Sequence, residues 1–167
     1  MNKIKKSITL IMIVILSMNI TVLAAGTNDI STEINSFEEV ESWEGEIDQY
    51  VDGEYNTNSN ARAAVTGALR LAQSGTKVVC SYSTSYSTSV SRIGVRNVRL
   101  MYLTSLKVWH TIVTLDDRYC TNDSLYAGAF TVTGTYNRTY MASCTHYYTN
   151  TVSSVSKYNE TGELTFK

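Results

Sequence analysis

The sequence predicts an all-β protein whose body, residues 61–167, folds as an antiparallel β-sandwich with an immunoglobulin-like or fibronectin-like arrangement. Apolar and polar residues alternate along most of this stretch, and turn residues interrupt it at short intervals. No segment of the body repeats its apolar residues at helical spacing. The body departs from true immunoglobulin domains, because Trp109 lies far from Cys80 and Ala142 replaces the corner tyrosine two positions before Cys144.

Residues 1–25 have the parts of a secretory signal peptide. Lysines within residues 3–6 make the start positive, the run 8–16 is almost entirely apolar, and small residues allow a cut after Ala24 or Ala25. The run is shorter than the roughly 20 residues that a membrane-spanning helix needs, so cleavage is favoured over an uncleaved anchor. We therefore expect a secreted, extracellular protein without stable membrane insertion.

Residues 26–60 are predicted to be an acidic arm and linker ahead of the body. Every charged residue in this stretch is acidic. Apolar residues recur there at spacings of three and four after Ser36, which forms a capping-box pattern with Glu39. The stretch 36–51 is therefore predicted to be a short amphipathic helix or an adaptable docking segment.

The body carries the opposite charge. Between residues 62 and 157 basic residues outnumber acidic ones, and they include Arg62, Arg70, Arg92, Arg96 and Arg99. The simplest partner for this positive charge is the chain's own acidic arm, so we expect residues 36–51 to dock on the body with Trp43 as the anchor. An exported protein rarely meets nucleic acid, so nucleic acid is not an expected partner.

The strands of the body follow from a period of two. The stretch from Cys80 to Ser91 places large residues on one face and serine on the other, as a strand requires. The pattern slips by one residue near Arg96 and Asn97, which indicates a bulge or turn. Strands are expected over residues 65–73, 80–91, 98–104, 107–115, 126–136, 140–146, 152–157 and 163–166.

Three cysteines make an odd number for an exported chain. Cys80 and Cys144 fall on the predicted inward faces of separate strands and are the candidate pair for a disulfide. Cys120, in a predicted polar loop, would be left as a free thiol or would join two chains into a homodimer. In an anaerobic habitat all three would stay reduced.

Residues with catalytic or metal-binding chemistry do not form a recognised pattern. Cys144 and His146 share a strand face and could form a nucleophile pair or half a zinc site, but nothing in the sequence completes either. His110 is interpreted as a packed strand residue, and the Asp and Asn residues of loop 116–124 as turn residues before calcium ligands. We predict no catalytic, metal-binding or cofactor-binding residue and a non-catalytic protein, with a hydrolase as the minor alternative.

Several segments resemble a set of small secreted proteins from Clostridia-type Gram-positive bacteria that is classed as a domain of unknown function. They are Ser42-Trp43-Glu44-Gly45-Glu46, Leu69-Arg70-Leu71, Trp109-His110-Thr111-Ile112, Leu115-Asp116-Asp117-Arg118-Tyr119 and Thr145-His146-Tyr147. The resemblance covers residues 36–167. It implies a bacterial exported protein and carries over no catalytic residue.

Two functions are compatible with these features. The first is a secreted binding module that recognises a protein or glycan through its loops or through an exposed face of tyrosine and serine. The alternative is a small exported toxin or bacteriocin-like protein, whose acidic arm restrains the basic body until it is removed.

Overall fold

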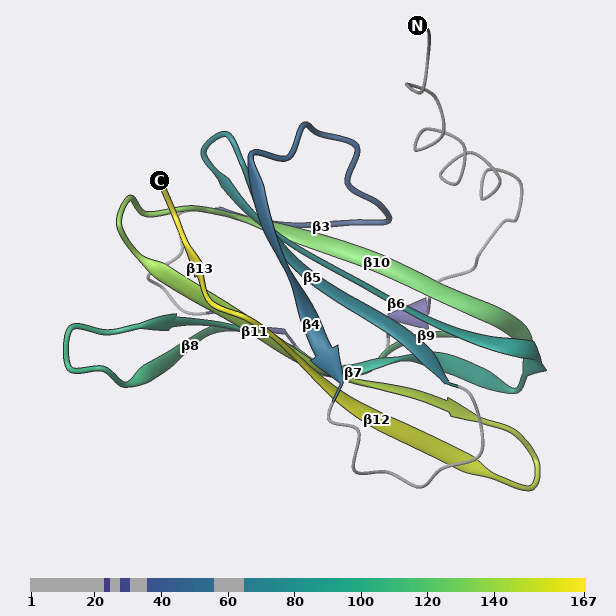
Figure 1. The fold of residues 1–167 in the computed structure, drawn as a ribbon. Helices are drawn as coiled ribbons and strands as arrows, with labels where there is room; N and C mark the ends of the chain where they lie inside the picture. The colour runs from purple at the N-terminus through teal and green to yellow at the C-terminus, as the bar shows by residue number, and fades with distance from the viewer. Residues whose placement is uncertain (1–22, 25–27, 31–35, 56–64) are drawn as a thin grey trace, which may run out of the picture.

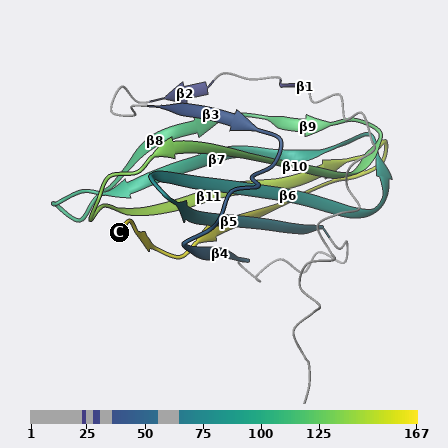
Figure 2. The same ribbon diagram turned by 90° about the horizontal axis from the view of Figure 1, so that it is seen from above.

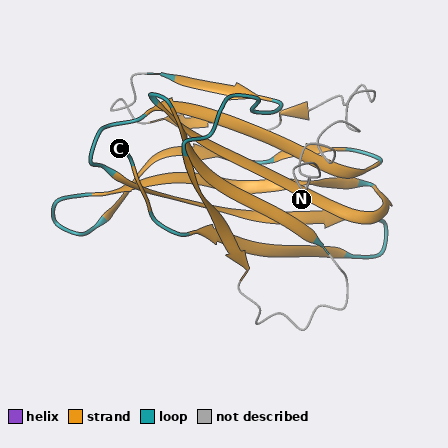
Figure 3. Ribbon diagram, turned by 45° about the horizontal axis from the view of Figure 1, so that its top comes forward, coloured by secondary structure: helices purple, strands orange, loops and turns teal. Residues whose placement is uncertain are grey.

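The computed structural model describes residues 23–24, 28–30, 36–55 and 65–167, which form two packed layers of antiparallel strands (Figures 1 and 3). The predicted all-β antiparallel class is confirmed, and no described residue is helical. The described residues accordingly include no helix long and apolar enough to cross a membrane. The signal peptide, apart from residues 23–24, and the linker 56–60 lie outside the described residues. The immunoglobulin-like arrangement stays a prediction.

We call the two layers sheet A and sheet B. Sheet A contains, in spatial order, β1 (Leu23–Ala24), β9 (Arg118–Cys120), β7 (Arg92–Leu103), β11 (Thr139–Thr149) and β12 (Ser154–Thr161). In the same sheet, β8 (Trp109–Leu115) pairs with β7 and with β2 (Asn28–Ile30), and β13 (Leu164–Thr165) pairs with β11. Sheet B contains, in spatial order, β3 (Phe37–Val40), β10 (Asp123–Thr133), β6 (Lys77–Val90), β5 (Thr66–Ser74) and β4 (Gln49–Tyr55).

The core lies between the inward faces of the two sheets. On β6 the even positions Cys80, Tyr82 and Thr84 are buried and the serines between them point outward, so the predicted alternation is confirmed. The tyrosines of β6 thus point into the core and do not share an exposed face with its serines. The predicted bulge is also confirmed, because the pairing of β7 with β11 shifts there and Asn97 takes a left-handed φ of 52°.

The predicted helix over residues 36–51 is wrong. Residues 37–40 form β3 against β10, and residues 49–55 form β4 against β5 and β12. A helix this short is marginal in water, whereas an edge strand satisfies its backbone groups on a sheet that already exists. With β2, three described strands of the sandwich therefore lie within residues 26–60, the stretch predicted to be an arm outside it.

One edge of the sandwich is closed by β4. Its first residues, 49–52, pair with β5 in sheet B, and residues 53–55 pair with β12 in sheet A. A single strand that belongs to both sheets holds their backbones together on this side.

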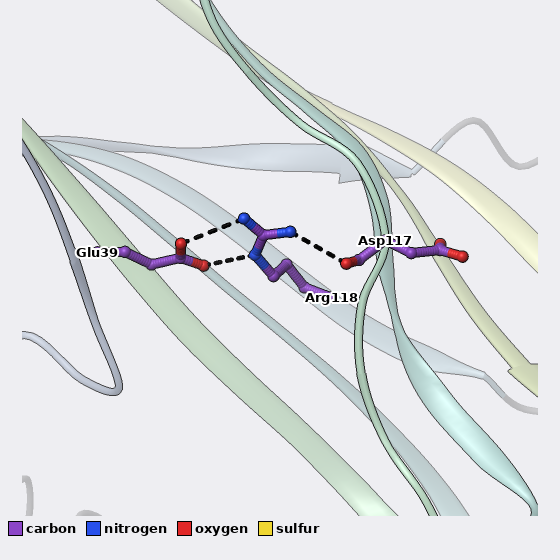
Figure 4. A network of polar contacts seen from close by, with 3 residues as sticks. All are labelled: Glu39, Asp117 and Arg118. Atoms are coloured by element: carbon purple, nitrogen blue, oxygen red, sulfur yellow. Dashed lines mark hydrogen bonds and ion pairs between the residues drawn. The ribbon is translucent and has the colours of Figure 1, made fainter. Parts of the chain in front are cut away.

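The opposite edge is closed by an ion pair between side chains (Figure 4). Glu39 of β3 points inward, as its pairing with the core residue Phe130 shows, and Arg118 reaches it from β9 of sheet A. The Arg118 Nε and Glu39 Oε1 atoms are 2.7 Å apart, and Nη1 donates to the main-chain oxygen of Asp117 at 3.1 Å. The Arg118 side chain is 2% exposed and that of Glu39 is 33% exposed, so the guanidinium is buried between the sheets while the carboxylate is in partial contact with water.

Residues 41–48, here called the acidic connection, lie over the outer face of sheet B. They must join β3 to β4, which occupy opposite edges of that sheet, and Figure 2 shows them crossing β10, β6 and β5. Asp48 Oδ2 accepts a hydrogen bond from the Gly75 amide at 2.7 Å. Trp43 is half-buried, with the Lys77 ammonium 5.4 Å from its ring centroid. The residue predicted to anchor the arm thus lies against the β5–β6 end of sheet B.

Candidate functional site

The cysteines are all buried and unbonded. The predicted bridge between Cys80 of β6 and Cys144 of β11 is not formed. The Cys144 thiol is instead in hydrogen-bond contact with His146, with Sγ 3.3 Å from Nε2. Cys120 lies on strand β9 and not in the predicted loop, and its thiol donates to the main-chain oxygen of Leu125 at 3.2 Å. A bond to a second chain would require this thiol to leave its buried position.

His146 is the centre of a buried polar cluster between the sheets. Thr84 Oγ1 lies 2.9 Å from the Gly94 oxygen and 2.8 Å from His146 Nδ1. Because the hydroxyl has one proton and gives it to the carbonyl, it must accept from Nδ1–H. Nε2 is then the acceptor that faces Cys144 Sγ at 3.3 Å and Asn159 Nδ2 at 3.4 Å.

This cluster contains a thiol, an imidazole and an amide, but the pKa values of its groups are those of uncharged side chains in a protein core. Burial raises the pKa of the Cys144 thiol to about 12. Burial, with a smaller contribution from Lys157, lowers the pKa of His146 to about 4. A nucleophilic cysteine needs the opposite shifts, so that a thiolate faces an imidazolium. At neutral pH the pair is uncharged, and the cluster serves to satisfy buried polar groups.

The loop considered for calcium forms turns. Asp123 Oδ1 accepts hydrogen bonds from the amides of Ser124 and Leu125 at 2.6 and 3.3 Å, and Asn122 has a left-handed φ of 56°. The part of the chain that the structure describes holds no group of three side chains that could bind a metal ion. His110 lies exposed on β8, where its ring contacts Tyr102, and is not packed as predicted.

The arm neutralises part of the basic body, and of the arginines named from the sequence this part includes Arg70. Arg70 pairs with Asp52, Lys77 with Glu38, and Arg118 with Glu39. Arg62 lies outside the described residues. The remaining three arginines named from the sequence, Arg92, Arg96 and Arg99, form no ion pair with any residue that the structure describes.

These three residues define a surface that we call the arginine face. They are exposed and project from the outer side of β7, because their neighbours Ile93, Val95, Val98 and Leu100 are buried in the core. The bulge at Asn97 is what returns Arg99 to the side of Arg96, since without the extra residue their odd spacing would place them on opposite faces.

Two tyrosine rings support the guanidinium groups. The Arg92 guanidinium lies 4.1 Å from the centroid of Tyr119, and that of Arg96 lies 5.4 Å from the centroid of Tyr147. Gly94 pairs with both tyrosines from the strand between them. A Cβ atom there would stand 2.0 Å from the main-chain oxygen of Arg118, so only glycine permits this approach of β9 to β7.

Hydroxyl groups make up much of the surrounding surface. Each arginine stands opposite a hydroxyl residue of β11, and the next strand continues the pattern; these residues are Thr149, Thr145, Ser143, Ser154, Ser156 and Tyr158. The carboxylates of Asp117 and Glu160 are half-buried, and neither forms an ion pair with an arginine among the described residues. The side-chain oxygens Tyr147 Oη and Asp117 Oδ1 are buried without a described hydrogen-bond partner. Asp29 of β2 lies in the same cross-strand row as Arg99, with Thr114 of β8 between them. On β7 itself, the exposed charges of this face are the three arginines.

The sequence identified these arginines as basic but not as a common face. The common face could have been found from the alternation of residues. Arg92 and Arg96 both occupy even positions and so lie on one side of a strand, and the one-residue slip between residues 96 and 97 places Arg99 on the same side. What the sequence could not indicate is that the acidic connection, residues 41–48, lies over sheet B, on the other side of the sandwich.

Comparison with known proteins gives no relative from which a role could be transferred. No protein-family model, no curated protein and no solved structure matches the chain.

Proposed function

We propose that this protein is a secreted, non-catalytic binding module whose arginine face binds a partner rich in carboxylate or other acidic groups. The observation that carries the proposal is the set of exposed arginines Arg92, Arg96 and Arg99, aligned on one strand and left without an acidic partner among the described residues. Export, and membership of a bacterial secreted family, are part of the proposal and come from the sequence.

The arrangement of the arginine face favours a role in binding an acidic partner over a role in solubility alone. Guanidinium groups bind carboxylates through two parallel hydrogen bonds, and a guanidinium held over an aromatic ring loses less side-chain freedom on binding. Arg92 and Arg96 are held in this way. A separation of four residues along a strand places their Cα atoms about 13 Å apart, which suits an extended partner more than a single small anion.

The test is binding of polygalacturonate, a polymer of carboxylates, to the wild type and to the triple variant R92Q/R96Q/R99Q. We expect the variant to bind at least about tenfold more weakly, a loss of about 1.4 kcal/mol, and to show a smaller dependence of affinity on salt. Isothermal titration calorimetry at several salt concentrations measures both.

The control is R70Q/K107Q/K167Q, which removes the same charge from exposed positions elsewhere. It should keep most of the wild-type affinity. Equal losses in the two triple variants would mean that net charge and not the arginine face determines binding, and the proposal would be wrong.

A further inference from the structure

We propose that the acidic partner is a second copy of this chain, whose acidic connection lies on the arginine face of the first. This inference rests on the proposed function of that face. It adds the identity of the partner and the geometry of the assembly.

The seven acids between residues 38 and 52 fall into two groups. Glu38, Glu39 and Asp52 form ion pairs within the molecule, and Asp48 accepts the Gly75 amide. Glu41, Glu44 and Glu46 are exposed on the acidic connection and form no ion pair with any described residue. Among the described residues, three acids on one short segment and three arginines on one strand are thus left without an ion pair.

These two charged groups lie on opposite sides of the sandwich. The acidic connection lies over the outer face of sheet B, whereas the arginine face is the outer face of sheet A (Figure 2). One molecule cannot bring them together, but two molecules stacked in the same orientation can. Charge complementarity of this kind speeds encounter and fixes orientation more than it adds affinity.

The connection is held firmly enough to act as a ligand. Its ends continue into β3 and β4, its Asp48 caps the β5–β6 turn, and Ser74 Oγ donates to the main-chain oxygen of Glu46. Beneath it Ala72, Val79 and Thr131 are almost completely buried, although their register places them on the outer side of sheet B. A segment fixed in this way loses little freedom when it binds.

The contact is heterologous, since it joins two different surfaces. Such a contact leaves an arginine face free at one end and an acidic connection free at the other, so it propagates into chains or closes into a ring. Exposed ion pairs are weak and screened by salt, so association should depend steeply on protein concentration and ionic strength.

Sedimentation velocity of the full exported chain tests the inference. At low salt the wild type should form species larger than a dimer as its concentration rises, and 0.5 M salt, about a 4 Å screening length, should return it to monomer. The variants R92Q/R96Q/R99Q and E41Q/E44Q/E46Q should each stay monomeric. Their equimolar mixture should form dimers and nothing larger, because each supplies the one surface that the other lacks.

A wild type that is monomeric at every concentration, or variants that associate as the wild type does, would overturn this inference. If the wild type is monomeric but still binds polygalacturonate through the arginine face, self-association is wrong and the proposed function stands. If the triple arginine variant also binds polygalacturonate normally, the proposed function fails with it. The variant R70Q/K107Q/K167Q should still assemble, because it retains both surfaces.

Discussion

Replacing Arg118 with methionine should lower the free energy of unfolding by about 2 kcal/mol, between the cost of breaking an exposed ion pair and that of breaking a fully buried one. The guanidinium joins the two sheets at the edge that β4 does not close, and its side chain is 2% exposed. Its removal leaves the Glu39 carboxylate, which points into the sandwich, without its partner. Urea denaturation followed by tyrosine and tryptophan fluorescence measures the change.

Two further variants separate this effect from a loss of charge. Arg70→Met breaks the exposed pair with Asp52, whose side chains are 48% and 56% exposed, and should cost no more than about 1 kcal/mol. The double variant R118M/E39M should recover much of the lost stability, because no buried charge then remains unpaired. A cost for Arg118→Met as small as that for Arg70→Met would contradict the description of this edge.

The stability of the protein should fall by about 3 kcal/mol between pH 7 and pH 4 through His146 alone. Burial, with a smaller contribution from the positive charge of Lys157, lowers its pKa from 6.5 to about 4. Between pH 6.5 and pH 4 the imidazole is therefore protonated in the unfolded chain and unprotonated in the folded chain. The contribution of neutral His146 to the free energy of unfolding is complete above about pH 6.5 and is lost as the pH falls through its folded pKa of about 4.

Denaturation curves at each pH, together with a histidine NMR titration, check this result. The chain has two histidines, so His110→Gln identifies the NMR signal that belongs to His146. His146→Gln should reduce the dependence of stability on pH over this window. If the latter variant does not fold, the NMR titration of His146 in the wild type decides, and a midpoint near 6.5 would be incompatible with the buried cluster.

The body of the fold could be predicted from the sequence because its signals are local. Alternation along residues 80–91 requires a strand with one buried face, and the slip near Asn97 requires a bulge. The strands that follow are confirmed with modest shifts at their ends, as β11 (Thr139–Thr149) against the expected residues 140–146 illustrates.

The arm could not be predicted, because its structure is determined by partners distant in sequence. Phe37 and Val40 fit a helical face, and only the presence of β10 makes a strand more stable there. Glu39 looked like part of a helix cap, yet it pairs with Arg118, 79 positions away. The prediction that Cys80 and Cys144 point inward was correct. The alternation of residues along each strand does not, however, show whether two inward thiols meet.

An NMR titration with polygalacturonate decides whether the outer face of sheet A is the binding surface. The protein is labelled with nitrogen-15 and kept dilute enough to be monomeric. We expect amide shifts to change along β7 from Arg92 to Met101, and at Tyr119 and Tyr147 beside it. Changes confined to sheet B or to the loops at the ends of the sandwich would contradict it.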